Sequence, residues 1–444
     1  MIRAVLAAAV AVVLALPARA AVDIVEVTSP GGITAWLVEE HSIPFVALDI
    51  RFKGGTSLDA PGKRGAINLM TAVLEEGAAD RDAQGFAAEA EALAARFRFR
   101  SFDDTILVSA SVLTENRDEA LELLRTALVE PRFDADAVER VRAQVLANIR
   151  SDSTDPSSIA GQRFDAMVFG DHPYATSGDG TLESVAALTR DDLVAAKDRV
   201  MARDRLFVAA VGDITAEELG PLLDRLLGGL PEAGAPMPDR APVTLAGGVE
   251  VVGFDTPQSV GIFGHEGVDR LDPDFFPAFV LDQLLGGSGF GSRLMTEVRE
   301  KRGLTYGIGT YLANFDHANL YLGQFSSAND RVAEAIAVVR EEWAKAAAEG
   351  VTQEELDRAK TYLTGAYPLR FDGNSTIAGI LSAMQAQGMP IDYAENRNAY
   401  IEAVTLDDVR RVAARLLDPD ALTFVVVGKP VGIDTAPGAG EPAN

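Results

Sequence analysis

Cysteine is absent from this chain of 444 residues. Without thiols the protein has no disulfide, no cysteine-ligated zinc and no thiolate nucleophile. Histidine is almost as scarce, with 4 in all, and no two of them lie within five residues of each other. Zinc-binding helices carry paired histidines four residues apart, so a self-contained helical zinc motif is excluded.

Basic residues are also scarce relative to acidic ones. Lys and Arg number 40 and Asp and Glu number 66, which gives a net charge of −26. This balance argues against nucleic-acid binding, which needs a basic surface, and against docking on anionic lipid. It favours solubility and the attraction of basic partners such as basic peptides. The 48% hydrophobic and 24% charged content is that of an ordinary globular protein.

Long apolar runs are limited to one, at residues 4–16. The run follows Arg3 and precedes Pro17, and residues 18–20 fit the small-x-small cleavage pattern of signal peptides. It is shorter than the roughly 20 residues that span a bilayer. We therefore expect a signal peptide at 1–20 and no membrane attachment after cleavage. Because export is combined with an absence of cysteine, we expect a location in a bacterial periplasm.

The two halves of the sequence repeat each other. Residues 188–193 and 404–409 share one Thr and two Asp at an offset of 216 residues, which also carries Gly212 onto Gly428. Each copy predicts a Thr-capped helix followed by an apolar strand that ends at glycine. We therefore expect two homologous lobes, at 21–230 and 249–430. A linker rich in Pro, Gly and Ala joins them at 231–248, and a disordered tail follows at 431–444.

The order of patterns within each half predicts the fold class. Apolar strands come first, long helices follow and a strand closes the half. The longest helical patterns lie at 87–95, 115–128, 134–151, 331–349 and 353–363. This order predicts an α+β protein in which each lobe has a mostly antiparallel sheet with helices packed on one face.

Four features of the chain resemble the insulinase/pitrilysin family of metallopeptidases, which includes mitochondrial processing peptidase. They are the duplicated lobe, the segment 169–174 with 188–193, the segment 65–77 and, most specific, residues 291–294 followed by 297–306. The resemblance covers nearly the whole mature chain and implies two lobes that form one half of a clam-shell. Bacterial members of this length usually pair two chains around a peptide chamber, which implies peptide substrates.

The family's zinc motif, His-x-x-Glu-His on a helix of the first lobe, is degenerate in this chain. Asn68, Thr71 and Ala72 stand at the matching positions and supply neither an imidazole ligand nor a carboxylate base. The family's further ligand is a Glu on a later helix. Here the only carboxylate of the helix at 137–150 is Glu139, which lies away from the expected place. We therefore expect no cofactor in this chain and zinc in a partner subunit.

An arginine and a tyrosine of the second lobe match residues that reach the active site of a zinc-bearing lobe in the family. We predict Arg299 near the end of a helix at 292–301, a left-handed glycine cap at Gly303, and Tyr306 on the strand at 304–312. Arginine offers planar charged donors and tyrosine a hydroxyl donor, which suit a substrate carbonyl and an oxyanion. The alternative is structural, with a cation at a helix C-terminus and a strand-forming tyrosine.

A glycine-rich segment at 286–291 matches neither a phosphate-binding loop nor a serine-hydrolase motif. The resemblance implies that the non-metal subunit contacts substrate through such a loop, here through Gly286, Gly287, Gly289 and Gly291. The alternative is a surface turn without a ligand. The sequence at 374–376 matches a glycosylation sequon, which we interpret as a turn.

The leading hypothesis for function follows from these residues. The chain would be the non-catalytic subunit of a heterodimeric periplasmic zinc peptidase and would pair with a zinc-motif-bearing paralogue. It would complete the peptide chamber and donate Arg299 and Tyr306 to substrate and oxyanion binding. The alternative is a non-enzymatic homo-oligomeric scaffold or peptide-binding protein, similar to the core proteins of the respiratory cytochrome complex. The Arg–Tyr pair favours the first hypothesis, since a scaffold has no need to orient an oxyanion donor.

Overall fold

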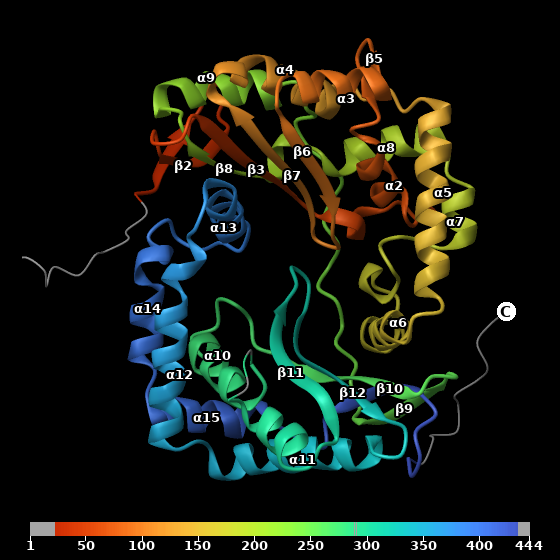
Figure 1. Ribbon diagram of the computed structural model, residues 1–444, viewed down its shortest axis with the longest axis vertical. Helices are drawn as coiled ribbons and strands as arrows, with labels where there is room; N and C mark the ends of the chain where they lie inside the picture. Colours follow the sequence, from red (N-terminus) through yellow and green to blue (C-terminus); the bar gives the residue numbers. More distant parts are fainter. Residues whose placement is uncertain (1–22, 288, 290, 434–444) are drawn as a thin grey trace, which may run out of the picture.

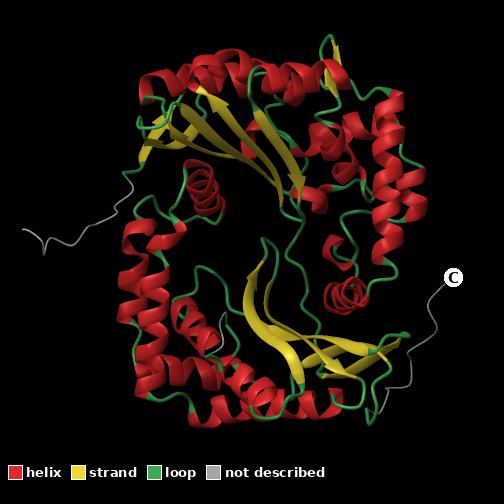
Figure 2. Cartoon of the chain, viewed as in Figure 1, coloured by secondary structure: helices red, strands yellow, loops and turns green. Residues whose placement is uncertain are grey.

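The computed structural model describes residues 23–287, 289 and 291–433. The expected signal peptide at 1–20, and residues 434–444 of the expected tail, lie outside the described residues. The chain forms two large sheets, one from each half of the sequence, with helices stacked around them (Figures 1 and 2). The predicted α+β class is confirmed. None of the helices within the described ranges combines the length and apolar character that a bilayer crossing requires.

The first sheet has six strands in the order β1-β2-β8-β3-β7-β6. Only the β2–β8 pair is parallel, so the sheet is mostly antiparallel as predicted. Its strands are β1 (Val25–Thr28), β2 (Thr34–Glu39), β3 (Phe45–Lys53), β6 (Arg96–Ser101), β7 (Thr105–Leu113) and β8 (Leu206–Gly212). The helices of this half that stay with it are α2 (Ala66–Val73), α3 (Ala83–Ala92), α4 (Arg117–Val129), α5 (Ala135–Asp152), α7 (Leu182–Ala186), α8 (Arg190–Val200) and α9 (Ala216–Leu227).

The second sheet has five strands in the order β11-β12-β10-β13-β9, and only its β13–β9 pair is parallel. Its strands are β9 (Gly248–Gly253), β10 (Gln258–Glu266), β11 (Thr305–Asn314), β12 (Asn319–Ala328) and β13 (Thr423–Gly428). The helices around it are α10 (Phe275–Leu285), the π-helix η5 (Met295–Glu300), α11 (Val332–Glu349), α12 (Gln353–Ala366), α14 (Tyr393–Ala403) and α15 (Leu406–Leu416).

Short elements complete the chain. A two-stranded ribbon consists of β4 (Gly77–Ala78) and β5 (Arg81–Asp82). Single 3₁₀ turns are η1 (Gly55–Leu58), η2 (Thr114–Asn116), η3 (Pro173–Ala175), η4 (Arg203–Arg205) and η6 (Pro368–Arg370). No helix or strand is assigned to residues 231–247 of the expected linker. The exact limits of the two lobes stay predictions.

The predicted repeat is visible in the helix starts. Thr189 and Asp192 form a capping box at the start of α8, and Thr405 and Asp408 form the same box at the start of α15. In each box the side chains of both residues bond the other's backbone N–H, which satisfies donors that a helix start leaves open. The predicted Thr caps are confirmed.

Each sheet is covered on its second face by one helix from the other half, a feature that the sequence patterns did not predict. Helix α13 (Asn374–Ala386) packs on β3 and β8 of the first sheet, with Leu381 and Met384 in a cluster with Ala47. Helix α6 (Pro156–Phe169) packs on β10 and β13 of the second sheet through Phe164 and Val168. Figure 1 shows α13 beneath the first sheet and α6 beside the second.

The prediction of a turn at 374–376 is wrong, because this segment begins helix α13. Asn374 is the first residue of α13 and follows Gly373, whose φ of 81° turns the chain into the helix. Asn374 is buried. The helix gains most of its stability from packing on a distant sheet, which local sequence cannot reveal.

Candidate functional site

Arg299 and Tyr306 meet where a short helix turns into the next strand. Arg299 lies on η5, and its Cζ is 5.4 Å from the centroid of the Tyr306 ring, which is a cation–π contact. Gly303 has a φ of 61°, and its N–H donates to the carbonyl of Arg299 at 2.9 Å. This is the pattern of a glycine-capped helix end. The predicted cap is confirmed, and the turn brings the two side chains together.

A β-bulge lies at the tyrosine on strand β11. Thr305 pairs with Ser327 and Ile308 with Phe325, so two residues of β11, Tyr306 and Gly307, face a single residue of β12. Tyr306 follows buried Thr305, so the two-residue period of the strand places it on the opposite, exposed side, and the extra residue returns Ile308 to the buried side. Tyr306 is 85% exposed. The hydroxyl is therefore available to a molecule outside this chain.

The glycine-rich segment after α10 is partly buried. Gly286 accepts a hydrogen bond from the N–H of Thr310 at 2.8 Å, and a Cβ on Gly286 would lie 2.4 Å from the Oγ1 of Thr310. Gly287 is buried as well, whereas Gly289 and Gly291 are exposed. The first glycine is thus explained by close packing against β11, and the two exposed glycines are within reach of a ligand. Substrate contact at this segment stays a prediction.

The degenerate zinc positions lie on α2, and their polar atoms have other partners. The Nδ2 of Asn68 donates to Asp179 at 2.9 Å, and its Oδ1 accepts from the hydroxyl of Ser101 at 2.7 Å. Thr71 is buried and donates to a backbone carbonyl of its own helix at 2.7 Å. Ala72 is exposed and has no donor atom in its side chain. None of these side chains offers the lone pairs that zinc binds in proteins.

Helix α5 does not complete a metal site either. The amide of Gln144 donates to Asn148 at 3.0 Å, and Glu139 pairs with Arg142 at 3.2 Å. In the part of the chain that the structure describes, no group of three His, Cys, Asp or Glu side chains could hold a metal ion. The residues present therefore do not fit zinc, and no chemistry of this chain is assigned to a metal of its own.

An acidic cavity of about 460 Å³ adjoins the degenerate site and is lined by Asp103, Asp104 and Asp179. Burial raises the pKa of the Asp104 carboxyl to about 6 and also raises that of Asp179. On α6, burial and the charge of Asp103 raise the pKa of Asp165 to about 7. The sequence patterns missed this cluster because its members come from a hairpin turn, a loop and a helix that no local pattern connects.

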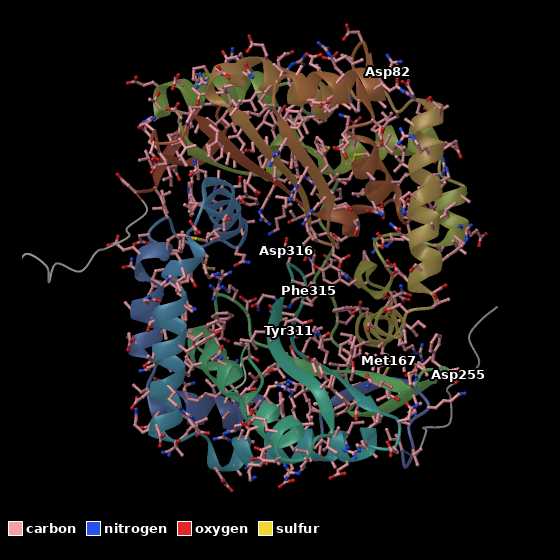
Figure 3. All side chains as sticks on the ribbon, viewed as in Figure 1. Asp82, Met167, Asp255, Tyr311, Phe315 and Asp316 are labelled. Atoms are coloured by element: carbon pink, nitrogen blue, oxygen red, sulfur yellow. The ribbon has the colours of Figure 1, made fainter. Side chains whose placement is uncertain are left out.

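The tip of the β11–β12 hairpin ties the two halves together beside this cavity. Asp104 accepts from the hydroxyl of Tyr174 and, at 3.0 Å, from the N–H of Asp316. That hydroxyl accepts in turn from the N–H of His317 at 3.2 Å. Figure 3 shows Phe315 and Asp316 at the hairpin tip, between the two sheets. Because the two bonds from the hairpin tip join residues 212 and 143 positions apart, they fix one wall of the cavity.

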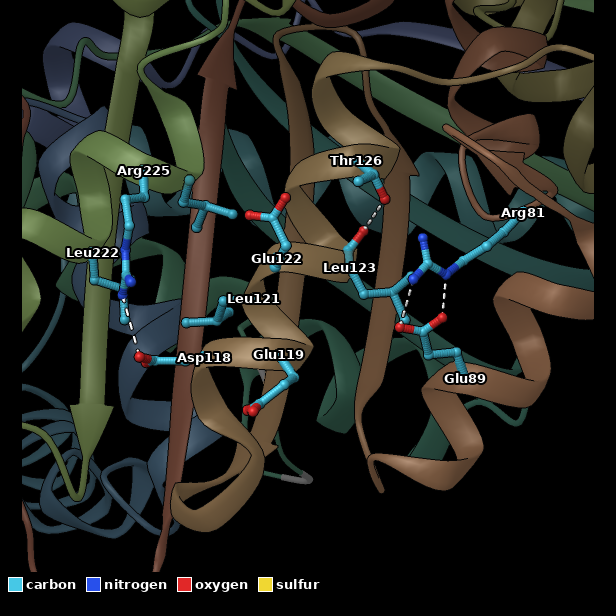
Figure 4. A pocket seen from close by; sticks show the side chains of 11 residues that line it. Arg81, Glu89, Asp118, Glu119, Leu121, Glu122, Leu123, Thr126, Leu222 and Arg225 are labelled. Atoms are coloured by element: carbon cyan, nitrogen blue, oxygen red, sulfur yellow. Dashed lines mark hydrogen bonds and ion pairs between the residues drawn. The ribbon is translucent and has the colours of Figure 1, made fainter.

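A larger cavity, of about 580 Å³, lies among α3, α4 and α9 (Figure 4). Both of its arginines pair with carboxylates of its wall: Arg81 bonds Glu89, and Arg225 lies 3.5 Å from Asp118 (Figure 4). None of the candidate residues from the sequence lines it. The candidate site is therefore the Arg299–Tyr306 pair of the second half.

The chain is similar to proteins of one peptidase family. The family described as "Insulinase (Peptidase family M16)" matches residues 35–178, and the one described as "Peptidase M16 inactive domain" matches residues 187–363. The non-peptidase homolog YmxG of Helicobacter pylori is 28% identical over 395 residues, which covers 88% of this chain and 90% of that protein. An uncharacterized zinc protease of Streptomyces coelicolor is 27% identical over 404 residues, with coverage of 88% and 86%.

Two solved structures have a fold similar to that of this chain. A peptidase M16 inactive domain from Pseudomonas fluorescens has a TM-score of 0.87 and 28% identity, covering 93% of this chain and 99% of that one. A chain of complex III2 from Candida albicans has a TM-score of 0.73 at 16% identity, with coverage of 92% and 96%. At that identity the second likeness concerns the fold alone.

Proposed function

Since this chain belongs to the M16 insulinase family, we propose that it is the non-catalytic subunit of a two-chain zinc peptidase. One observation carries the proposal. The Arg299–Tyr306 pair is assembled, with the guanidinium carbon 5.4 Å from the tyrosine ring, while Asn68, Thr71 and Ala72 replace the metal ligands and base. A chain that orients substrate-binding donors but lacks a catalytic centre is suited to complete the centre of another chain.

The two side chains have separate tasks in this proposal. The guanidinium of Arg299 donates to a substrate carbonyl, and the hydroxyl of Tyr306 donates to the oxyanion that forms when the peptide bond is attacked. Donors fixed before the reaction stabilise such a charge strongly because they do not have to reorganise. The cation–π contact holds the guanidinium against the tyrosine ring, and the exposure of Tyr306 lets both reach a site on another chain.

Relatives support the inactive role of the isolated chain. The non-peptidase homolog YmxG is named as lacking peptidase function, and the Pseudomonas fluorescens structure is named as an inactive domain. The partner in this proposal is a paralogue that bears the zinc motif, and the two chains together enclose peptide substrates in the bacterial periplasm. The acidic cavity at Asp103 and Asp179 supports a preference for basic peptides, because it attracts positive charge.

A homo-oligomeric scaffold or peptide-binding protein is the second candidate. The likeness to a chain of complex III2 favours it, because that fold is found there within a larger assembly. The two candidates differ in what Tyr306 does: a scaffold is indifferent to its hydroxyl, whereas a peptidase subunit needs it.

Co-purification and metal analysis test the proposal. The mature chain is expressed alone, and then with the zinc-motif paralogue exported by the same organism, without chelator in either case. We expect no zinc in the chain alone, a stable heterodimer in the second preparation, and one zinc per heterodimer. One tightly held zinc per isolated chain, or failure of the two chains to associate at micromolar concentration, would contradict the proposal.

A further inference from the structure

Three arginines line an aromatic cavity of about 400 Å³ between α10, α13 and α14. They are Arg270, Arg370 and Arg397, which come from a loop, from η6 and from α14. Phenylalanine and tyrosine rings form much of the remaining wall. This cavity lies in the second half, apart from the residues of the degenerate metal site.

Aromatic rings hold two of these guanidinium groups in place. The Cζ of Arg270 lies 4.0 Å from the ring centroid of Phe275, and the side chain also donates to the hydroxyl of Tyr393. The Cζ of Arg397 lies 4.5 Å from the ring centroid of Tyr367, and its Nη1 donates to a backbone carbonyl at 2.7 Å. Arg397 is only 6% exposed. The positive groups are therefore ordered before any ligand arrives, which lowers the cost of binding one.

The charges of this arginine pocket are not neutralised by the protein. Among the residues that the structure describes, none of Arg270, Arg370 and Arg397 forms an ion pair with a carboxylate, although the chain carries a net charge of −26. Burial and, to a smaller extent, the charges of Arg370 and Arg270 lower the pKa of Arg397. Like charges gathered in a half-buried cavity destabilise one another, and an anionic ligand relieves that repulsion.

One hydrogen bond links the wall of the arginine pocket to the wall of the acidic cavity. Gly379 lines the arginine pocket, and its carbonyl accepts from the Nη2 of Arg51 at 3.3 Å. Arg51 in turn lines the acidic cavity.

We propose that the arginine pocket binds the C-terminal carboxylate of a peptide whose last side chain is aromatic or long and aliphatic. This inference rests on the proposed function, since it assumes that peptides enter the space that the chain helps to enclose. Planar guanidinium groups match a carboxylate in paired hydrogen bonds, which favours a carboxylate over a spherical anion. The rings take up the apolar side chain, which a phosphate ion alone would leave unfilled.

A binding measurement on the isolated mature chain tests this inference without the partner. The probe is a ten-residue peptide that ends in phenylalanine and carries a fluorophore at its N-terminus, followed by anisotropy. Its two controls are the same peptide with an amidated C-terminus and the same peptide ending in glycine. We expect the amide and the glycine peptide each to bind at least about tenfold more weakly, since each lacks one of the two recognised groups.

Variants locate the binding on the chain. Arg370 is exposed and Arg270 half-buried, so R370Q and R270Q are expected to fold and to weaken binding of the phenylalanine peptide about tenfold or more. R358Q is the matched control, because Arg358 is an exposed arginine of α12 outside the pocket. Thermal unfolding of each variant verifies that it folds. Equal affinity for the amidated peptide, or unchanged binding in both pocket variants, would overturn the inference.

Competition separates the possible sources of the carboxylate. If 3-phenylpropionate alone binds as tightly as the peptide, the pocket is built for a small acid and the peptide inference fails. The result of the peptide-binding experiment can be read separately from any test of the proposed function. A chain that binds the peptide but never supports activity with a zinc-bearing partner contradicts the subunit role, whereas an active pair with no carboxylate preference contradicts only this inference.

Discussion

Replacing Tyr306 by phenylalanine separates a chemical role from a structural one more cleanly than any other single change. The variant loses one hydroxyl and keeps the ring, so the contact with Arg299 at 5.4 Å is retained. Because the side chain is 85% exposed and its hydroxyl has no protein partner in the described residues, the free energy of unfolding should change by less than about 0.5 kcal/mol. Assembly with the partner should be unaffected.

The effect on turnover should be large by comparison. Loss of one oxyanion donor costs roughly 2.7–4 kcal/mol of transition-state stabilisation, which corresponds to a fall in kcat of about 10²–10³-fold. The assay is steady-state hydrolysis of a quenched fluorescent peptide by the pair of chains, with KM measured alongside kcat. We expect KM to change little, since the oxyanion exists only in the transition state.

Tyr311→Phe is the matched control for this experiment. Tyr311 lies on the same strand, is 49% exposed and loses the same hydroxyl. It should leave kcat within about twofold of the wild-type value, because surface changes of this kind are small. An unchanged kcat in Tyr306→Phe, or an equal loss in Tyr311→Phe, would refute the oxyanion role. Loss of assembly in Tyr306→Phe would point to packing instead.

Two further predictions concern stability. The pKa of Asp165 is raised to about 7, so the folded state binds the extra proton, and its contribution to stability falls as pH rises from about 4 to 7. Asp165→Asn should therefore stabilise the protein by about 1–2 kcal/mol at pH 8 and by little at pH 4. The value at pH 8 is smaller than the full pKa shift would give, because the carboxyl is partly hydrated. Equal changes in the free energy of urea unfolding at the two pH values would contradict this prediction. Gly286→Ala should cost about 1–3 kcal/mol, since its Cβ would lie 2.4 Å from the Oγ1 of Thr310, whereas Gly291→Ala, with no atom within 4 Å, should be near neutral in the same assay.

Local signals made part of the fold predictable. Thr189 and Thr405 precede acidic residues and apolar periodicity in the same spacing, so both helix starts could be placed from the sequence. Gly303 similarly marked the end of the helix that carries Arg299. These features depend on contacts between residues a few positions apart, which sequence patterns describe well.

Contacts between distant segments were not predictable in the same way. Helix α13 carries small residues such as Ala378 and Ser382, and it is stabilised by strands more than 160 residues earlier in the chain. The extra residue at Tyr306 and Gly307 leaves no clear pattern either, because a bulge shows only when both strands are seen. In the sequence, each of the three arginines of the arginine pocket looks like an ordinary surface residue, and only the fold brings them together.

The most direct test of the subunit role compares three solutions. Hydrolysis of one quenched fluorescent peptide is measured with this chain alone, with the zinc-motif partner alone, and with an equimolar mixture. We expect negligible hydrolysis in the first two and turnover only in the mixture, because the zinc and the Arg299–Tyr306 pair belong to different chains. Hydrolysis by this chain alone, or a mixture no faster than the partner by itself, would contradict it.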